Sequence, residues 1–436
     1  MSAERPEKFQ SLTGMRDVLW PDSARHRALV DAFANTAELA GYRELVLPLV
    51  EDLGVFLRVG EATDVVTKEM YDFTDRDGTR IALRPEMTAG VARAFVQHKP
   101  LVPWKVFYAG SNFRHERPQK GRYRAFEQVG LEALGSDDPD LDVEVIVLAW
   151  RFFESIGLRE VKLLLNTLGD HDERARYGHA VEQHLRSHSE ELSESSVETL
   201  ERNPLRVLDS KRREDRAVIS TAPSISEFLG PESGEHFSRV KEGLESLEVP
   251  FTVDERLVRG LDYYRRTTFE FAAVALDAAQ NAIGGGGRYD RLVEDLGGPP
   301  TDGIGFALGV DRILLAADAE GVFDKPQPYL DAFVVDMTGG QQARALTHEL
   351  RSAGFGADRR FGGGSMKAQM KAADRSGAAV AVIVGEEELA AGELTIRALR
   401  HHSDTAGDAA QRRVQRTDLI SSISEYATAE RPTTTP

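Results

Sequence analysis

The chain has 436 residues, of which 41% are hydrophobic and 29% are charged. This length exceeds one typical domain of about 100–200 residues, and no stretch approaches the ~18 apolar residues that a membrane-spanning helix needs. We therefore expect two or three folded units and no membrane insertion. The lack of cysteine excludes disulfides, thiolate metal ligands and thiol nucleophiles. The polar N-terminus lacks the apolar core of a secretory signal, which predicts a cytoplasmic protein.

The formal charge of −17, taken alone, argues against a polyanionic partner. Only 11 of the 54 basic residues are lysine, and the guanidinium group of the others pairs bidentately with carboxylate and phosphate. Two interpretations stay open at this point. The acidic, lysine-poor surface is an adaptation to solvent, for instance to high salt, or the protein avoids nucleic acid. The positions of the positive charges must decide between them.

The predicted elements begin with a helix that Ser23 caps and Gly41 ends, with apolar residues at helical spacing. A strand is predicted over 42–50, and Pro48 places it at an edge or an interface because proline cannot donate to a sheet ladder. The strands do not alternate regularly with helices, which favours a mainly antiparallel sheet flanked by helices. The further predicted strands are 79–84, 104–109, 126–134, 251–257, 267–276 and 304–308.

The polar, charge-rich stretch at about 171–250 is typical of an inserted helical subdomain. A proline-containing linker follows it near residue 326, and beyond the linker strands and helices alternate. We therefore expect one domain over 1–325 and a second, α/β domain over 326–436. The elements predicted in the second domain are strands 331–337, 379–384 and about 394–399 and helices at about 340–353 and 365–376.

Two features that suggest ligand sites have simpler interpretations. The run Gly284–Gly287 fits neither the phosphate-loop nor the dinucleotide pattern, which favours a structural turn that lets a neighbouring strand or ligand approach closely. His184 and His188 stand one helical turn apart, but no third metal ligand is in view. We interpret these histidines as surface residues, and no side-chain metal site is identified.

The segment 114–124 carries five basic residues against one acidic residue, in contrast to the chain as a whole. It lies between two predicted strands, and its proline and glycine favour a loop. Beyond it, Gln128 and Glu132 lie on one strand face, with Phe126 at the same parity. A solvated hairpin loop is one interpretation. The other is a triphosphate bound under the arginine-rich loop, with a polar small molecule beneath.

Three other segments each have a packing explanation when taken alone. A helix cap explains 83–88 (LRPEMT), a buried tyrosine pair explains 258–266 (VRGLDYYRR), and a glycine-spaced strand turning into a helix explains 303–313 (GIGFALGVDRI). Together with FRHERPQKGRYRAFEQVG, however, they resemble the class II aminoacyl-tRNA synthetases. LVRGLDYYRRTTFEF resembles the signature of the histidyl-tRNA synthetase family within that class. The resemblance runs from about residue 14 to about residue 397.

The resemblance implies an α+β fold: a six-stranded antiparallel sheet with flanking helices, a helical insertion and a C-terminal α/β anticodon-binding domain. It implies that the carboxylate of L-histidine attacks the α-phosphorus of ATP, with Mg²⁺ bound through the ATP phosphates. The histidyl group then passes to tRNA-His. The segment that ends near Pro48 resembles a dimer-interface motif, so the family also implies a homodimer.

The resemblance also implies roles for individual residues. Arg259 and Arg114 are the implied catalytic residues, with Arg259 beside the attacking carboxylate. The residues implied to bind histidine are Glu86, Met87, Thr88, Gln128, Glu132, Tyr263 and Tyr264. Those implied to bind ATP are Arg114, Glu116, Phe126 and Arg312. Those implied to bind tRNA are Gln119, Arg122, Arg360 and Lys367.

Two alternatives remain. One is a catalytically inactive, histidine-binding paralogue such as the regulatory subunit of ATP phosphoribosyltransferase, which usually lacks the C-terminal domain and erodes the signature. Here Arg259, Tyr263, Tyr264 and the unit at 331–399 are present. The other is a synthetase for threonine, proline or glycine, whose pocket is not expected to carry RGLDYY. The segments implied to meet ATP and tRNA are locally basic, so the net charge is a poor guide to the partner.

Overall fold

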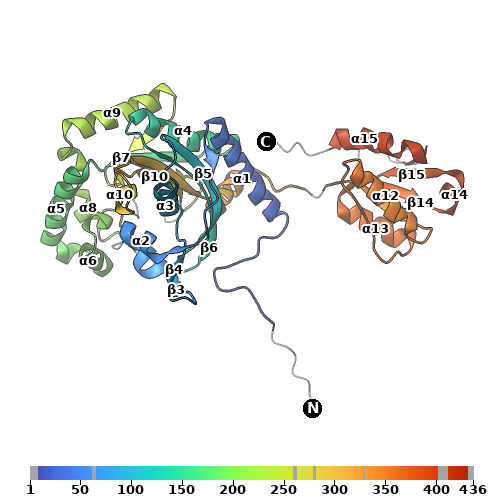
Figure 1. Ribbon diagram of the computed structural model, residues 1–436, viewed down its shortest axis with the longest axis horizontal. Coiled ribbons are helices and arrows are strands. Elements are labelled where there is room, and N and C mark those ends of the chain that lie inside the picture. The colour runs from blue at the N-terminus through green and yellow to red at the C-terminus, as the bar shows by residue number, and fades with distance from the viewer. Residues whose placement is uncertain are drawn as a thin grey trace, which may run out of the picture. The chain divides into compact units, whose positions relative to one another are not determined.

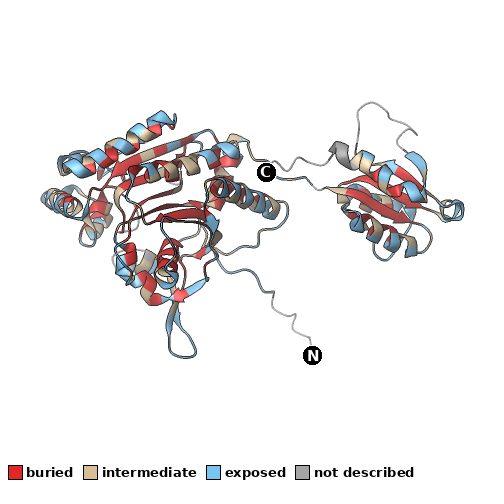
Figure 2. Ribbon diagram, turned by 45° about the horizontal axis from the view of Figure 1, so that its top comes forward, coloured by how far each residue is buried: buried red, intermediate tan, exposed pale blue. Residues whose placement is uncertain are grey.

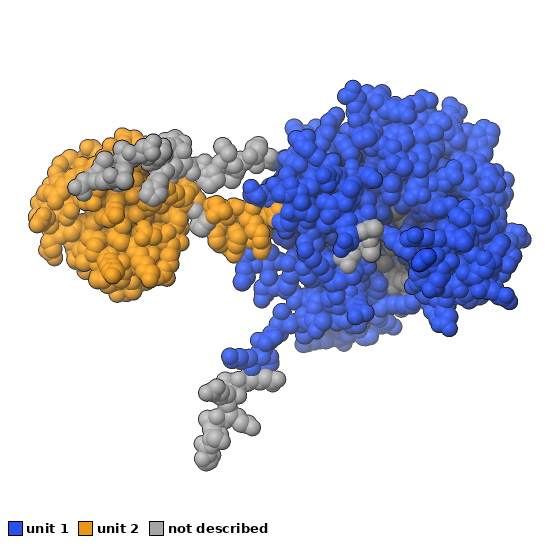
Figure 3. Space-filling view, turned by 180° about the vertical axis from the view of Figure 1, so that it is seen from behind, with its two compact units in different colours: residues 1–19, 26–324 blue, residues 20–25, 325–436 orange. Residues whose placement is uncertain are grey.

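A computed structural model describes residues 8–60, 65–258, 263–277, 281–327, 329–400 and 411–430. The chain divides into two compact units, shown in Figure 3. The larger comprises residues 1–19 and 26–324, and the smaller comprises residues 20–25 and 325–436. None of the described helices combines the length and the apolar character that crossing a membrane would require.

The larger unit is built on an eight-stranded sheet with the order β1-β5-β6-β11-β10-β9-β7-β8 (Figure 1). The six strands from β5 to β7 pair antiparallel, and a short parallel strand joins each edge. The predicted six-stranded antiparallel sheet is therefore confirmed as the centre of a wider sheet. Its strands are β1 (Arg43–Glu44), β5 (Trp104–Phe113), β6 (Ala125–Leu134), β7 (Val161–Thr167), β8 (Phe251–Val253), β9 (Arg265–Ala273), β10 (Ala282–Arg288) and β11 (Gly303–Gly309).

The main core lies between this sheet and four helices. At its centre the ring of Phe33 meets those of Phe152 and Phe306 edge to face, with ring centroids 5.3 and 6.1 Å apart. Figure 2 shows that the strands and the inner faces of the helices are buried. A second buried cluster, with α3 (Thr88–His98) and α10 (Leu292–Asp295), holds Tyr263 and Tyr264. The four helices of the main core are α1 (Asp22–Leu39), α4 (Pro139–Ser155), α9 (Pro231–Ser246) and α11 (Val310–Glu320).

The strand predicted over 42–50 is largely wrong. Within this range only Arg43, Glu44 and Val50 lie in strands, and Val50 begins a second short strand that pairs in a separate sheet of order β2-β4-β3. Between them, the guanidinium of the buried Arg84 donates to the carbonyl oxygens of Leu47 and Pro48, at 2.9 and 3.2 Å. The side chain of Arg84 thus makes the hydrogen bonds that a neighbouring strand would otherwise make with this segment. The elements of this region are β2 (Val50–Asp52), α2 (Leu53–Gly60), the π-helical turn η1 (Val65–Glu69), β3 (Tyr71–Thr74) and β4 (Arg80–Leu83).

Most helices of the stretch 171–250 share a small core of their own, around Tyr177 and Leu205. The buried carboxylate of Asp215 helps to hold this core together because it accepts hydrogen bonds from three serine hydroxyls. The last helix, α9, differs: it packs on α4 in the main core. The elements of the small core are α5 (His171–Ser187), η2 (Ser189–Glu191), α6 (Glu194–Leu200), α7 (Pro204–Val207), α8 (Arg216–Ser220) and η3 (Ile225–Glu227).

The smaller unit has a five-stranded sheet of order β13-β12-β14-β15-β16. β12 pairs parallel with β13 and β14, as in an alternating α/β unit, and the remaining pairs are antiparallel. Helices cover both faces of this sheet. Its strands are β12 (Leu330–Asp336), β13 (Ala357–Arg359), β14 (Ala378–Val384), β15 (Glu393–Ala398) and β16 (Gln411–Gln415); its helices are α12 (Gln341–Ser352), α13 (Met366–Ser376), α14 (Glu386–Ala391), η5 (Arg416–Asp418) and α15 (Leu419–Glu430).

Candidate active site

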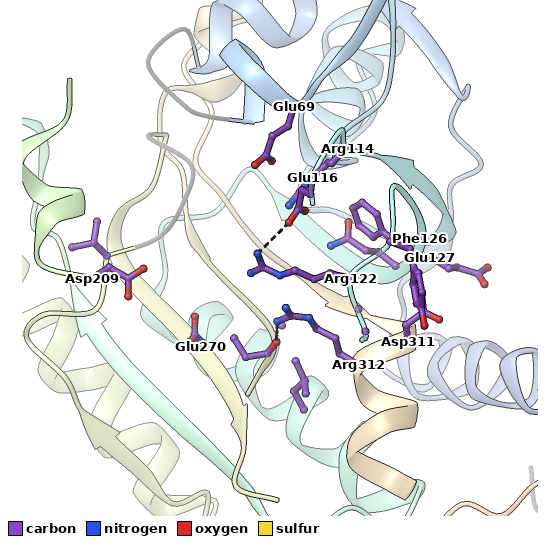
Figure 4. Close-up of a pocket in the computed structure, with 18 of the residues that line it drawn as sticks. Glu69, Arg114, Glu116, Arg122, Phe126, Glu127, Asp209, Glu270, Asp311 and Arg312 are labelled. Atoms are coloured by element: carbon purple, nitrogen blue, oxygen red, sulfur yellow. Dashed lines mark hydrogen bonds and ion pairs between the residues drawn. The ribbon is translucent and has the colours of Figure 1, made fainter. Parts of the chain in front are cut away.

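A pocket of about 390 Å³ opens in the larger unit, where the loop 114–124 faces β10 and the start of α11 (Figure 4). Its lining combines arginines, carboxylates and one phenylalanine ring. Six of the residues named from the sequence line it together: Arg114, Glu116, Arg122, Phe126, Gln128 and Arg312. Four further lining residues that the sequence did not single out are Glu69, Arg206, Asp209 and Glu270.

The arginines of the pocket are held by neighbouring groups. The guanidinium of Arg114 lies 5.2 Å from the centre of the Phe126 ring, and its Nε donates to the carbonyl oxygen of Pro85 at 2.9 Å. Arg122 pairs with the carboxylate of Glu116 at 3.1 Å (Figure 4). The orientation of these two arginines is therefore fixed by Phe126 on β6, by the backbone carbonyl of Pro85 and by Glu116 in the loop.

Arg312, at the start of α11, carries an incompletely paired charge. One of its terminal nitrogens donates to the carbonyl oxygen of Ala282, whereas Nη2 is buried without a hydrogen-bond partner among the described residues. Burial, together with the nearby charges of Arg122 and Arg114, lowers the pKa of Arg312 to about 10. Cations placed so close together favour the entry of an anion between them.

The glycine run forms the middle of strand β10, so the prediction of a turn is wrong. The prediction of close approach is confirmed. A Cβ atom on Gly286 would lie 1.9 Å from the carbonyl oxygen of Gly305, and one on Gly284 would lie 2.4 Å from a methyl carbon of Leu308. The sequence suggested a turn because glycine disfavours strands. Here the neighbouring strand β11 leaves no room for side chains.

A buried carboxylate lies on the same sheet. Glu132 is fully buried, and three hydroxyl groups donate to it: Thr88 Oγ1 at 2.7 Å, Tyr108 Oη at 3.0 Å and Tyr289 Oη at 2.6 Å. Burial raises the pKa of Glu132 to about 8 despite these hydrogen bonds. The side chain fits because Gly305, opposite it, has no Cβ; that atom would lie 1.6 Å from Oε2.

Two buried tyrosines belong to the same cluster. The rings of Tyr263 and Tyr264 lie 4.7 Å apart, and the ring of Tyr263 meets that of Tyr289 edge to face. Tyr263 Oη is buried and has no hydrogen-bond partner in the part of the chain that the structure describes. A buried hydroxyl without a partner beside a buried carboxylate can recognise a polar ligand with both donor and acceptor groups.

Glu86 caps the helix that borders this cluster. Its carboxylate accepts hydrogen bonds from the backbone N–H groups of Thr88 at 2.6 Å and Ala89 at 3.0 Å, at the start of α3. Burial raises the pKa of Glu86. A helix cap was one explanation of the segment 83–88, and Glu86 provides it, whereas the hydroxyl of Thr88 donates to Glu132. Met87, between them, is buried.

The remaining predicted residues are distributed as follows. Gln128 Oε1 accepts from Asn112 Nδ2 at 2.8 Å, and Gln119 forms a bridge with Arg122 within the loop. Arg259, the residue expected to be catalytic, lies outside the described residues. His184 and His188 lie close to backbone carbonyl oxygens, at 2.9 and 2.8 Å, and the described residues include no cluster suited to a metal ion.

A second cavity, of about 460 Å³, lies in the smaller unit. Arg344, Arg359 and Arg360 line it together with the glycines 362–364, and Phe361 beside them is 74% exposed. The guanidinium of Arg359 lies 5.0 Å from the centre of the Phe361 ring. Lys367 follows in the first turn of α13. This cavity is basic although the chain is acidic.

An antiparallel sheet that carries an arginine-lined pocket, together with a helical insertion and a separate α/β unit, is the architecture of a class II aminoacyl-tRNA synthetase. Comparisons with known proteins agree. Residues 14–313 match the family model "Histidyl-tRNA synthetase", and residues 331–426 match "Anticodon binding domain". The chain belongs to the histidyl-tRNA synthetase family, as the motifs predicted.

Individual relatives are similar over most of their length. The chain is 47% identical to a histidine–tRNA ligase of Rhodococcus erythropolis, over 90% of this chain and 93% of that one. It is 44% identical to one of Geobacillus kaustophilus, over 89% and 93%. The structure matches S. aureus histidyl-tRNA synthetase with a TM-score of 0.79 and 33% identity, over 95% of this chain and 100% of that one.

One solved structure bears on the alternative of a regulatory paralogue, but it is less similar to this chain than the S. aureus enzyme is. A Bacillus halodurans protein described as an ATP phosphoribosyltransferase regulatory subunit/histidyl-tRNA synthetase has a TM-score of 0.61 and 21% identity, over 84% of this chain and 97% of that one. At that identity the likeness concerns the fold alone. The family models and relatives favour the synthetase over the paralogue.

Proposed function

We propose that the protein is a histidine–tRNA ligase, which joins L-histidine to ATP as histidyl-adenylate and transfers the histidyl group to the 3′ end of tRNA-His. The observation that carries this proposal is the pair of adjoining polar sites on one sheet. One site gathers arginines for a triphosphate. The other holds a buried carboxylate and a buried tyrosine hydroxyl suited to an imidazole.

In the first step, a carboxylate oxygen of histidine attacks the α-phosphorus of ATP and pyrophosphate leaves. The protein's part in such a transfer is positioning and charge stabilisation. We assign the α-phosphate to Arg114, the adenine amino group to Glu116, and the two adenine faces to Phe126 and Arg312. Their common location in one pocket supports these roles.

The buried cluster is the proposed histidine site. Glu132 and Tyr264 would read the two imidazole nitrogens, which an apolar isostere could not satisfy. Tyr263, with its buried hydroxyl, belongs to the same site. Glu86 and Thr88 are assigned to the ammonium group; both sit at the start of α3 and reach the cluster through the hydrogen bond from Thr88 to Glu132.

Gln128 is assigned to the carboxylate of histidine. It lines the arginine pocket and lies on the same strand as Glu132. It would therefore stand between the two sites, where the carboxylate of histidine meets the α-phosphate.

Mg²⁺ is proposed to enter with ATP. It prefers oxygen ligands and often binds through substrate phosphates, water and one or two carboxylates. The lining of the pocket offers such oxygens in Glu270 and Asp209, and the described residues contain no preformed cluster of three metal ligands. When bound, the ion would neutralise phosphate charge.

The reaction is tested by ATP–pyrophosphate exchange with each of the twenty amino acids. We expect exchange with histidine alone. Exchange with threonine, proline or glycine would indicate a related synthetase. No exchange at any salt concentration, with retained histidine binding, would indicate the regulatory paralogue and overturn the proposal.

Arg259 is proposed as a catalytic residue on its motif alone. Arg259→Ala is expected to lower the single-turnover rate of adenylate formation by about 100- to 1,000-fold, because it removes a charge beside the attacking carboxylate and the α-phosphate. The affinity for histidine should change far less. The exposed Arg256 provides a matched control as Arg256→Ala. An unchanged single-turnover rate in Arg259→Ala would refute the role.

The smaller unit is proposed to bind the anticodon region of tRNA-His, through Arg360 and Lys367, while Gln119 and Arg122 approach the acceptor end. The basic cavity supports this, because arginine and exposed aromatic rings are common contacts for phosphates and unpaired bases.

The double variant Arg360→Glu/Lys367→Glu is expected to raise the KM for tRNA by about tenfold or more, because it replaces two cations near the phosphate backbone by anions. Pyrophosphate exchange should stay normal. Arg412→Glu on β16, at the other edge of the sheet, is the control for added negative charge. Equal tRNA KM values in the double variant and the control would refute the assignment.

We also infer a homodimer in the cytoplasm. Three large apolar side chains near the edge strand β1 and ahead of β5 are almost fully exposed: Leu39 (91%), Val46 (83%) and Leu101 (92%). Large apolar side chains left exposed beside an edge strand are what an interface would cover. The mass in solution, from light scattering, is expected to be twice that of the chain; a monomer at micromolar concentration would contradict this.

A further inference from the structure

We propose that Arg16, His26, Glu127 and Asp311 form a charge network that positions the two walls of the nucleotide pocket, and that the affinity for ATP depends on the proton that His26 holds. The inference rests on the proposed function, because it assumes that ATP occupies the pocket of Figure 4. It adds positioning residues that do not themselves touch the reacting atoms.

His26 joins two elements of the pocket. It projects from α1, and its Nδ1 lies 3.2 Å from Glu127 Oε2 on β6. Its Nε2 lies 3.6 Å from Asp311 Oδ1 at the start of α11. The side chain of His26 is only 12% exposed, so water screens these interactions weakly.

Arg16 adds a second cation to the same network. It forms an ion pair with Asp311, and its guanidinium lies 4.2 Å from the centre of the Tyr123 ring in the loop 114–124. The N-terminal segment that carries Arg16 also forms a backbone hydrogen bond with that loop, because the carbonyl oxygen of Gly14 accepts from Arg124 N at 2.8 Å. The N-terminal segment therefore braces the arginine-rich loop against α11.

The network is adjacent to both proposed adenine contacts. Glu127 follows Phe126 along the chain, and Asp311 precedes Arg312. The backbone between them is paired, with Gln128 opposite Gly309. Because His26 contacts both Glu127 and Asp311, it fixes the positions of these two residues. Each of them adjoins, along the chain, a side chain that would hold the adenine ring. His26 should thereby preserve the spacing between Phe126 and Arg312.

The network also balances charge at the pocket. Glu127 and Asp311 both line it, where a triphosphate would be repelled by uncompensated carboxylates. With His26 protonated, two cations face two carboxylates. With His26 neutral, Arg16 still pairs with Asp311, and the negative charge of Glu127 is left uncompensated beside the nucleotide.

The protonated form of His26 predominates near neutral pH. The adjacent carboxylates, Asp311 first and Glu127 next, raise the pKa of His26 from 6.5 to about 9. Because this pKa is raised, the stabilising contribution of the proton is complete below pH 6.5 and is lost as pH rises through about 9. The charged groups that face His26 are Glu127 from β6 and Asp311 from α11, with Arg16 beyond Asp311.

The test compares ATP KM values at saturating histidine, from pH 7 to 9.5, in pyrophosphate exchange. We expect the KM of the unmodified protein to rise above pH 8.5. His26→Gln should raise it about five- to tenfold at pH 7 and abolish the rise, because an amide keeps a hydrogen bond but not the charge. His26→Lys, which keeps the charge, should stay near the unmodified value at pH 7.

Several outcomes would overturn the inference. One is an unchanged ATP KM in His26→Gln, and another is an equal rise of the KM for ATP and for histidine, which marks general structural damage. If His26→Gln does not fold, Arg16→Met serves instead, since the side chain of Arg16 is 42% exposed, and an unchanged ATP KM in that variant is equally decisive. Absence of exchange in the unmodified protein would instead overturn the proposed function.

Discussion

Glu132→Gln is expected to lower kcat/KM for histidine by about 1,000-fold or more, with a much smaller change in the KM for ATP. In the proposed site an imidazole N–H donates to Glu132 and so favours its ionised form, which only accepts hydrogen bonds, as it does from three hydroxyl groups. The amide has nearly the same shape but also donates. A site built to hydrogen-bond a polar group rejects a ligand that lacks it by about 10⁴ to 10⁵, so a mismatch on the protein side should also be costly. Pyrophosphate exchange at varied histidine measures the loss.

The same substitution should not lower stability at alkaline pH. Burial raises the pKa of Glu132 from 4.5 to about 8, so its contribution to the free energy of unfolding is complete below pH 4.5 and is lost as pH rises through about 8. Glutamine has no charge to bury. The Tm of Glu132→Gln relative to the unmodified protein is therefore expected to increase between pH 5 and pH 9.

Glu154→Gln, on the exposed side of α4, is the matched control and should leave activity and the pH dependence of Tm unchanged. A constant Tm difference for Glu132→Gln across this pH range would contradict the raised pKa. Retention of normal histidine activation would contradict the proposed site itself.

Arg312→Met is expected to lower kcat/KM for ATP by about 100- to 1,000-fold, because it removes a charge and a stacking surface from the nucleotide pocket. ATP should raise the Tm of the unmodified protein but not that of the variant, since a ligand stabilises only a protein that binds it. Thermal melts with and without ATP and Mg²⁺ measure this difference.

Without ATP, the Tm of Arg312→Met is expected to equal or slightly exceed that of the unmodified protein. The pKa of Arg312 is lowered to about 10, chiefly by burial, which means that the folded protein disfavours its charge. Removing that charge removes the penalty. Arg151→Met, at an exposed position on α4, is the control. A lower Tm in Arg312→Met together with an unchanged ATP KM would show that the side chain serves the fold instead of the nucleotide.

Sequence motifs were sufficient for much of the site. Arg114, Phe126 and Arg312 come from two separate motifs and line one pocket, as the resemblance implied. The strands predicted around them are also present, because their apolar residues are regular. The sequence predicts a turn where β10 is a strand, because glycine propensity is a local property whereas the close packing of β11 is not.

Other parts of the site carry no local signal. The hydroxyls of Tyr108 on β5 and of Tyr289, directly after β10, both donate to Glu132, and their meeting depends on the register of the sheet. Arg206 and Asp209 line the pocket from the helical insertion, which the sequence described only as charged and helical. Periodicity indicates which residues are buried, but not which distant residues meet.

By itself, the sequence determined the class of protein and the position of the basic segment 114–124, and it showed that the net charge of −17 is a poor guide to the partner. These properties follow from the types and spacing of neighbouring residues. Only the tertiary structure decided that Glu132 has a pKa of about 8 and that His26 joins Glu127 to Asp311. A pKa and a charge network depend on burial and on distances between residues far apart in the chain, and folding alone sets both.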